Sequence, residues 1–143
     1  MLKGISPILS PELLAAICSM GHGEEIVLAD AHYPANRYSR NVIRADGLAI
    51  PALLEALLPL FELDAYVENP VVMMAPVDGD QLDPNVEISY REIIARHNSA
   101  TPPPARLERF AFYERTTSAF AIVATGDINK YANVILTKGV TPV

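Results

Sequence analysis

The sequence predicts an α/β fold with one mixed sheet of about six strands and helices packed on its faces. Short apolar stretches typical of buried strands alternate with segments that carry helix-start signals. The last two predicted strands lie too close in sequence for a helical crossover, so the sheet is expected to be mixed rather than wholly parallel. The 143 residues suffice for a single domain, which we expect to span residues 1–143.

The first predicted helix begins at Ser10, whose hydroxyl suits an N-cap, and Pro11 fits the first helical position. Gly21 is expected to end this helix. The mostly apolar run 25–30 then predicts a short buried strand. The polar segment 31–41, which contains a proline, predicts a loop.

The middle of the chain predicts a strand, a helix and another strand. Residues 42–46 form a second candidate strand, and residues 51–60 a helix with prolines near both of its ends. The run 70–77 is strongly apolar and leads into an Asp-Gly-Asp turn, so it predicts a third strand.

The second half begins with a helix over 84–97, for which Asp83 is the expected N-cap. Residues 107–113 alternate between polar and apolar positions, which favours a strand. Two further short stretches, 120–125 and 132–137, complete the six predicted strands.

Composition excludes several classes of protein. Half of the residues are hydrophobic, which rules out intrinsic disorder. A net charge of −6 argues against nucleic acid and anionic membranes as partners, and no apolar run is long enough to span a bilayer. The apolar excess for a chain this small predicts a homo-oligomer. The one cysteine, Cys18, is expected to be buried, and its being alone favours a reducing cytoplasm.

The first candidate site is His22, which lies between two glycines after the first predicted helix. Glycine on both sides leaves the imidazole little crowded, and an unperturbed imidazole titrates near neutral pH. His22 could therefore transfer protons. The simpler alternative is an exposed histidine at a helix end.

The second candidate is Asp30, followed closely by His32, where a predicted core strand runs into a loop. Open α/β sheets bind ligands at the carboxyl ends of their strands. A turn-forming aspartate beside a surface histidine is the alternative. His22, Asp30 and His32 could also hold a metal, but no further metal-ligand spacing supports that interpretation, and we expect no metal site.

Two more candidates lie in the second half. Arg109, inside the predicted strand 107–113, either binds an oxygen-rich ligand or forms a structural ion pair. Tyr131 and Asn133 are two residues apart, so on a strand they would face the same way and could bind sugar hydroxyls. Ordinary strand composition is the alternative for this pair.

Several well-known motifs are absent from the sequence. It contains no Walker loop, G-x-G-x-x-G, G-x-S-x-G or H-E-x-x-H motif. Nucleotide-dependent chemistry, triad hydrolysis and zinc proteolysis therefore lose support. Proton transfer on a small polar ligand remains.

The sequence resembles the fucose mutarotase and D-ribose pyranase family almost from end to end. The stretches that carry the resemblance are Met-Gly-His-Gly-Glu-Glu-Ile (20–26), Ala-Asp-Ala-His-Tyr-Pro-Ala (29–35), Ile-Arg-Ala-Asp-Gly-Leu (43–48), Pro-Leu-Phe-Glu-Leu-Asp (59–64), Arg-Phe-Ala-Phe-Tyr-Glu-Arg (109–115) and Lys-Tyr-Ala-Asn (130–133). The resemblance implies a cofactor-free enzyme that interconverts the anomers of a monosaccharide such as L-fucose. It also implies a homodecamer with sites between neighbouring subunits.

The same resemblance implies roles for individual residues. His22 corresponds to the family's catalytic histidine, with Tyr131 a second candidate for proton transfer. Asp30, Arg109, Tyr131 and Asn133 correspond to substrate-binding positions, and the arginine favours a fucose-type activity. A ribose-type pyranose–furanose interconversion and a non-catalytic sugar-binding subunit remain alternatives.

Overall fold

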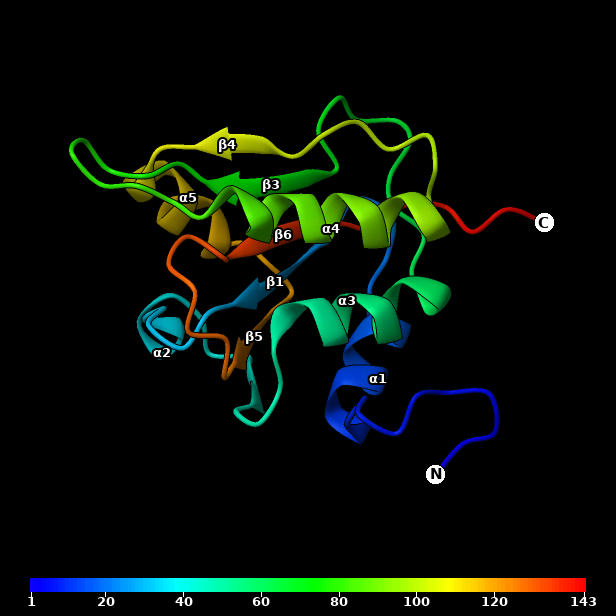
Figure 1. The fold of residues 1–143 in the computed structure, drawn as a ribbon. Coiled ribbons are helices and arrows are strands. Elements are labelled where there is room, and N and C mark those ends of the chain that lie inside the picture. The colour runs from blue at the N-terminus through cyan, green and yellow to red at the C-terminus, as the bar shows by residue number, and fades with distance from the viewer.

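The computed structural model describes all 143 residues and contains one six-stranded sheet flanked by helices (Figure 1). The strands are β1 (Glu25–Ala29), β2 (Val42–Ala45), β3 (Val71–Met74), β4 (Ala105–Leu107), β5 (Ala121–Thr125) and β6 (Val134–Thr137). The helices are α1 (Pro11–Ser19), α2 (Ala35–Tyr38), α3 (Ile50–Leu57), α4 (Pro84–His97) and α5 (Arg109–Thr116), with a 3-10 turn, η1 (Leu58–Leu60), after α3. The predicted fold class is confirmed.

The sheet has the order β2-β5-β1-β6-β3-β4. Its pairs are parallel except those made by β6, which runs antiparallel to both β1 and β3. Val27 in β1, for example, lies opposite Ile122 of β5 and Ile135 of β6. The mixed sheet was predicted from the short link between β5 and β6. In the structure these two strands do not pair, because β1 lies between them.

Side chains of β1 alternate between two hydrophobic cores. Ile26 and Leu28 pack with α1, α3 and α4 on one face, while Val27 and Ala29 pack with α2 and α5 on the other. Successive strand residues point to opposite faces, so an uninterrupted apolar strand suits a sheet covered on both sides. The result is three layers with β1 and β6 at the centre (Figure 1).

The predicted caps are present on two helices. The Ser10 hydroxyl accepts a hydrogen bond from the Leu13 main-chain N–H at 3.1 Å, and Asp83 accepts one from Asn85 at 2.9 Å. These side chains bind main-chain donors that the first helical turn leaves free. Cys18, by contrast, is exposed on α1 rather than buried, because Leu13, Ala16 and Ile17 form the inward face of that helix.

The largest departure from the sequence prediction lies in residues 107–113. Only Ala105–Leu107 form a strand, and the helix α5 begins at Arg109. The Glu108 carboxylate accepts hydrogen bonds from the main-chain N–H groups of Phe110 and Ala111, so it caps the helix. The buried positions Phe112 and Thr116 are four residues apart, which is the helical spacing. The predicted loop 31–41 likewise contains the short helix α2.

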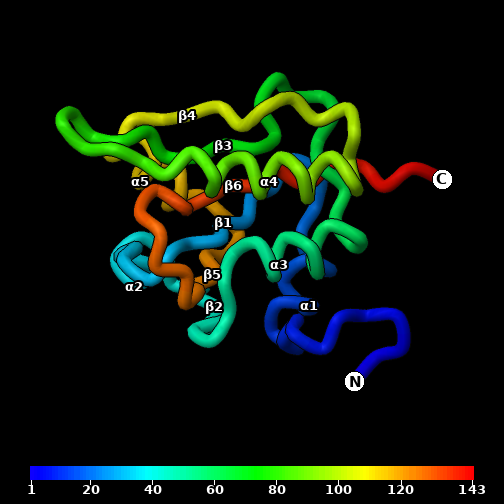
Figure 2. Tube along the Cα trace, viewed as in Figure 1, coloured from blue at the N-terminus to red at the C-terminus, as the bar shows by residue number.

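The connections that follow β1, β3 and β5 project from the same end of the sheet (Figure 2). The His22 loop, which precedes β1, and the segment that precedes β3 belong to the opposite end. None of the helices is long and apolar enough to cross a membrane.

Candidate active site

The four residues predicted to bind substrate line one open cavity of about 480 Å³: Asp30, Arg109, Tyr131 and Asn133. Asp30 directly follows β1 and Arg109 lies just beyond β4, whereas the other two precede β6. Because β6 is reversed, its start meets the carboxyl ends of its neighbours, where open α/β sheets bind ligands. The cavity is large enough for a small polar ligand.

Asp30 and Asn133 form the floor of this cavity. Both residues are buried, and the Asn133 Oδ1 accepts the main-chain N–H of Asp30 at 2.7 Å. The carboxylate of Asp30 accepts the main-chain N–H of His32 at 3.0 Å. Burial raises the pKa of Asp30, and the hydrogen bond from His32 opposes that shift. The carboxylate is a hydrogen-bond acceptor fixed at the cavity, and the Asn133 amide nitrogen remains available as a donor.

Tyr131 lies in a loop rather than on a strand, which corrects the sequence expectation. Its φ is 60°, a left-handed conformation that is uncommon for residues other than glycine. Such backbone strain costs on the order of 1–3 kcal/mol and concentrates at functional sites. The conformation carries the Tyr131 hydroxyl to the carboxylate of Asp80, to which it donates at 2.6 Å.

Asp80 was not predicted from the sequence. It also accepts hydrogen bonds from the Lys130 ammonium group at 2.8 and 3.0 Å. Lys130 and Tyr131 together lower the pKa of Asp80 to about 2, and the same contact raises the pKa of Tyr131. Asp80 therefore orients two side chains that line the cavity. Its position in an Asp-Gly-Asp turn had indicated only a turn.

Arg109 is exposed at the first turn of α5, so the prediction that it lies on a strand is wrong. Its Nε donates to the Tyr113 hydroxyl at 3.3 Å, and this hydrogen bond raises the pKa of Arg109. The guanidinium carbon lies 5.4 and 5.5 Å from the ring centroids of Phe110 and Tyr113. No carboxylate pairs with Arg109, so its charged group is available at the mouth of the cavity.

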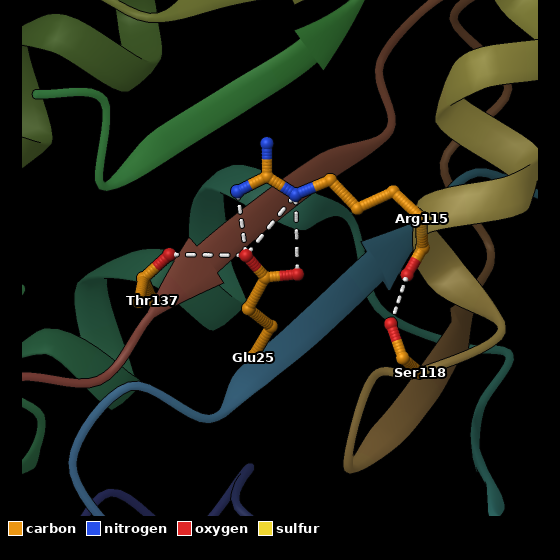
Figure 3. A network of polar contacts seen from close by, with 4 residues as sticks. All are labelled: Glu25, Arg115, Ser118 and Thr137. Atoms are coloured by element: carbon orange, nitrogen blue, oxygen red, sulfur yellow. Dashed lines mark hydrogen bonds and ion pairs between the residues drawn. The ribbon is translucent and has the colours of Figure 1, made fainter. Parts of the chain in front are cut away.

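Arg115, in the last turn of α5, does form the structural ion pair that the sequence had left open for Arg109. It contacts both carboxylate oxygens of Glu25, with the closest N···O distance at 2.5 Å (Figure 3). Thr137, at the end of β6, donates to the same carboxylate at 3.4 Å. This network attaches the end of α5 to the starting end of β1, away from the cavity.

His22 does not share the cavity. It precedes β1 whereas Asp30 follows it, so the five-residue strand, about 16 Å long, lies between them. The His22 Nε2 lies 3.1 Å from Oδ1 of Asp64, a buried carboxylate that the sequence analysis did not single out. The His22 side chain is 48% exposed.

His32 lines the cavity, and its Nε2 lies 3.3 Å from the carbonyl oxygen of Ile128. Asp30 and His32 follow the end of β1 in a turn, where the Asp30 carboxylate accepts the His32 main-chain N–H. His22 lies at the other end of the sheet, so within one chain the three are not brought together. No group of three His, Cys, Asp or Glu side chains is arranged to hold a metal.

Comparison with known families supports a single assignment. The model of the RbsD / FucU transport protein family matches residues 3–141. A Haemophilus influenzae protein named L-fucose mutarotase is 58% identical over 143 residues, which cover all of this chain and 99% of that protein. A Glaesserella parasuis protein of the same name is also 58% identical and is covered to 98%.

Solved structures agree with the sequence relatives. The fucose mutarotase from Streptococcus pneumoniae, solved in complex with L-fucose, superposes with a TM-score of 0.93 at 45% identity, over 99% of this chain and 100% of that one. Bacillus subtilis RbsD, solved with D-ribose, superposes with a TM-score of 0.73 at 23% identity, over 99% and 100% of the two chains. The second similarity concerns the fold alone.

Proposed function

The chain belongs to the RbsD / FucU transport protein family, and we propose that it acts as an L-fucose mutarotase, an isomerase that interconverts the α and β anomers of the sugar. The cavity at the end of β1 carries the proposal, because it gathers a fixed carboxylate, an amide, a phenol and an unpaired guanidinium. Such groups suit the many hydroxyls of a monosaccharide. The relatives named L-fucose mutarotase, which are 58% identical, support the choice of sugar.

Mutarotation opens the cyclic hemiacetal and closes it on the other face. A base removes the proton of the anomeric hydroxyl while the bond from C1 to the ring oxygen breaks, and an acid gives the ring oxygen a proton. Rotation about the C1–C2 bond and the reverse transfers complete the reaction, so protons balance without a cofactor. General acid–base catalysis contributes roughly 10²–10⁴-fold, which suits a reaction that already proceeds in water.

We assign His22 the principal proton transfer and Tyr131 the second. Tyr131 lines the cavity and its raised pKa keeps the phenol protonated at neutral pH, so it can act as the acid. Asp30, Arg109 and Asn133 are assigned to recognition of the sugar hydroxyls. These roles rest on the resemblance of the motifs and on the chemistry of each group.

The separation of His22 from the cavity points to a site shared between subunits. One protomer would supply the cavity at the end of β1, and a neighbour would supply His22 from the opposite end of its own sheet. Exposed apolar side chains lie near both halves: Phe110 and Ile128 near the cavity, and Tyr66 beside His22. Such side chains suit contacts between copies. A head-to-tail arrangement of this kind closes into a ring when the rotation between neighbouring copies returns to the first one.

We further propose that residues 1–143 form one mutarotase domain, that the ring is a homodecamer, and that the enzyme acts in the cytoplasm without a cofactor. Light scattering after size-exclusion chromatography measures the assembly. The lone thiol of Cys18 is in keeping with a reducing compartment.

The primary test is NMR exchange spectroscopy of L-fucose anomers with and without the protein. His22→Gln is expected to lower exchange at least about tenfold, equal to roughly 1.4 kcal/mol in the barrier. His97→Gln is the matched control, because His97 lies on α4 in a pair with Glu55 and outside the cavity. Binding of fucose without acceleration of exchange would instead indicate a sugar-binding subunit.

A complementation assay tests the shared site. His22→Gln and Asp30→Asn chains are each expected to be strongly impaired as homo-oligomers. Mixed by refolding together, they restore about one quarter of the sites, since a quarter of head-to-tail contacts combine an intact His22 with an intact Asp30. No recovery in a mixed oligomer would contradict a site built from two subunits.

A further inference from the structure

The backbone on both sides of His22 is held by hydrogen bonds, although the His22 side chain is half exposed. The Gly23 main-chain N–H donates to the Lys138 carbonyl at 2.8 Å. The Gly21 N–H donates to the Glu24 carboxylate at 2.6 Å. Both neighbours of His22 are therefore fixed, and so is the direction in which its side chain leaves the backbone.

The imidazole itself is held by Asp64. Only 2% of the Asp64 side chain is exposed, whereas 48% of the His22 side chain is. The ring of His22 also packs against that of Tyr66, with centroids 5.4 Å apart. One edge of the imidazole thus faces the protein through Nε2, and Nδ1 has no hydrogen-bond partner within the chain.

Asp64 is itself immobilised. Its Oδ1 accepts the main-chain N–H of Tyr66 at 2.9 Å in addition to the contact with His22. Its own N–H donates to the Thr137 carbonyl at 3.0 Å. Gly139 packs so closely on this segment that a Cβ there would lie 2.8 Å from the Cα of Asp64. The carboxylate oxygen is held in place on the side of the sheet that carries His22.

A carboxylate accepts hydrogen bonds and does not donate them, so the contact requires a proton on Nε2 of His22. In the neutral ring the lone pair then lies on Nδ1. We propose that Asp64 is a positioning residue that holds His22 in the Nε2–H form and makes Nδ1 the atom that exchanges a proton with the sugar. The role of Nδ1 toward the sugar rests on the proposed function, whereas the orientation of His22 by Asp64 does not.

During ring opening, Nδ1 takes the proton of the anomeric hydroxyl, and the ring becomes a cation with a proton on each nitrogen. The second group gives its proton to the ring oxygen as the C1–oxygen bond breaks. On reclosure Nδ1 returns its proton to the new anomeric hydroxyl, and the former ring oxygen returns its proton to the second group as the C1–oxygen bond re-forms. Nε2 keeps its proton and its bond to Asp64 throughout.

Two substitutions separate positioning from folding. Asp64→Ala removes the acceptor, so neutral His22 is free to populate both tautomers. Asp64→Asn keeps an acceptor at the same point, because the Tyr66 N–H would oppose an amide N–H₂ placed there and so selects the amide oxygen. The amide therefore preserves the Nε2–H form, and Asp64→Asn is the conservative variant expected to rescue the effect of alanine.

The first measurement is the two-bond ¹H–¹⁵N spectrum of ¹⁵N-histidine protein at about pH 8.5, where an imidazole is neutral. The chain has three histidines, so His22→Gln assigns the signal. We expect a protonated Nε2 and an unprotonated Nδ1 in the native protein and in Asp64→Asn, and mixed tautomers in Asp64→Ala. A protonated Nδ1 in the native protein would overturn the proposal, even if the alanine variant fails to fold.

The second measurement is L-fucose exchange as kcat and KM. Asp64→Ala is expected to lower kcat at least about fivefold with KM within about twofold, and Asp64→Asn to recover most of the loss. Glu55→Ala, which breaks the surface pair between Glu55 and His97, is the control and leaves both constants unchanged. Full kcat in a folded Asp64→Ala protein would refute the positioning role. Absence of exchange in the native protein would refute the proposed function, while the tautomer spectrum still decides whether Asp64 orients His22.

Discussion

The main-chain N–H of Asp30 donates to the side-chain Oδ1 of Asn133 at 2.7 Å, across 103 positions of the chain. The bond joins the end of β1 to the residue before β6, at the buried floor of the cavity. It fixes the amide of Asn133 and the backbone of Asp30 together. Each of these residues therefore helps to hold the other in position for binding the sugar.

Asn133→Ala leaves the buried N–H of Asp30 without an acceptor. We expect the free energy of unfolding to fall by about 1–3 kcal/mol, the usual cost of an unsatisfied buried donor, and KM for L-fucose to rise. Urea unfolding and exchange kinetics measure the two effects. Asn85→Ala, at an exposed position of α4, is the control. An Asn133→Ala protein as stable as the native one would show that the bond adds nothing.

Asp30→Asn is expected to increase stability at neutral pH and to impair sugar binding. Burial raises the pKa of Asp30 above its value of 3.8 in a model peptide, so the folded state holds the proton more tightly than the unfolded state. Native stability therefore falls as pH rises through the window between those two pKa values, and the loss is complete above it. The gain in Asp30→Asn is full at pH values above the window and shrinks as pH falls through it. A gain that is independent of pH would exclude the desolvated carboxylate as its cause.

Arg109→Ala should weaken sugar binding without weakening the fold. Its guanidinium is exposed, has no carboxylate partner and lines the cavity. We expect KM for L-fucose to rise about tenfold, as for the loss of one charge-assisted hydrogen bond of about 1.4 kcal/mol, with an unchanged unfolding midpoint. Arg37→Ala removes a comparable cation–π contact outside the cavity and serves as the control. Undiminished binding in Arg109→Ala would show that this arginine does not bind the sugar and only contacts Phe110 and Tyr113.

Breaking the pair between Glu25 and Arg115 should destabilise the fold and leave the cavity intact. The two side chains are 17% and 35% exposed, between a surface pair and a buried one. Arg115→Ala is expected to cost about 1–2 kcal/mol in urea unfolding, and the cost should diminish as salt screens the pair. Arg115→Lys recovers only part of it, because an ammonium group cannot make the same planar contacts. Equal stability of the lysine and native proteins would contradict the importance of those contacts.

The sequence predicted most of the sheet because its strands are short and apolar, and helix starts because Ser10 and Asp83 are strong N-caps. It failed at residues 107–113, where one alternating pattern suits both a strand and the start of a helix. Glu108 decides between them by capping α5, a contact that depends on side-chain geometry. Strand order also lay beyond reach, since β1 separates the consecutive strands β5 and β6.

The cavity residues Asp30, Arg109, Tyr131 and Asn133 were predictable because each stands in a recognisable motif. The roles of Asp80 and Asp64 were not predictable. Asp80 lies in a segment with the composition of an ordinary turn, and Asp64 ends the stretch 59–64, which carries the family resemblance but indicates no role for this residue. Their importance comes from partners 51 and 42 positions away, Tyr131 and His22. Only the folded chain brings these pairs together.

The reversed direction of β6 gives this four-residue strand a second consequence. At its start it leads from Tyr131 and Asn133, and beyond its end Lys138 accepts the Gly23 N–H beside His22. In the proposed head-to-tail assembly, this strand would set the distance between the two halves of the shared site, at about 3.3 Å per residue. One inserted residue would exchange the side chains of β6 between the two hydrophobic cores, and in the proposed assembly it would displace the cavity relative to the histidine at the other end of the strand. In such an assembly, the spacing between successive shared sites would depend on the length of β6, the one strand that runs antiparallel to its neighbours in the sheet.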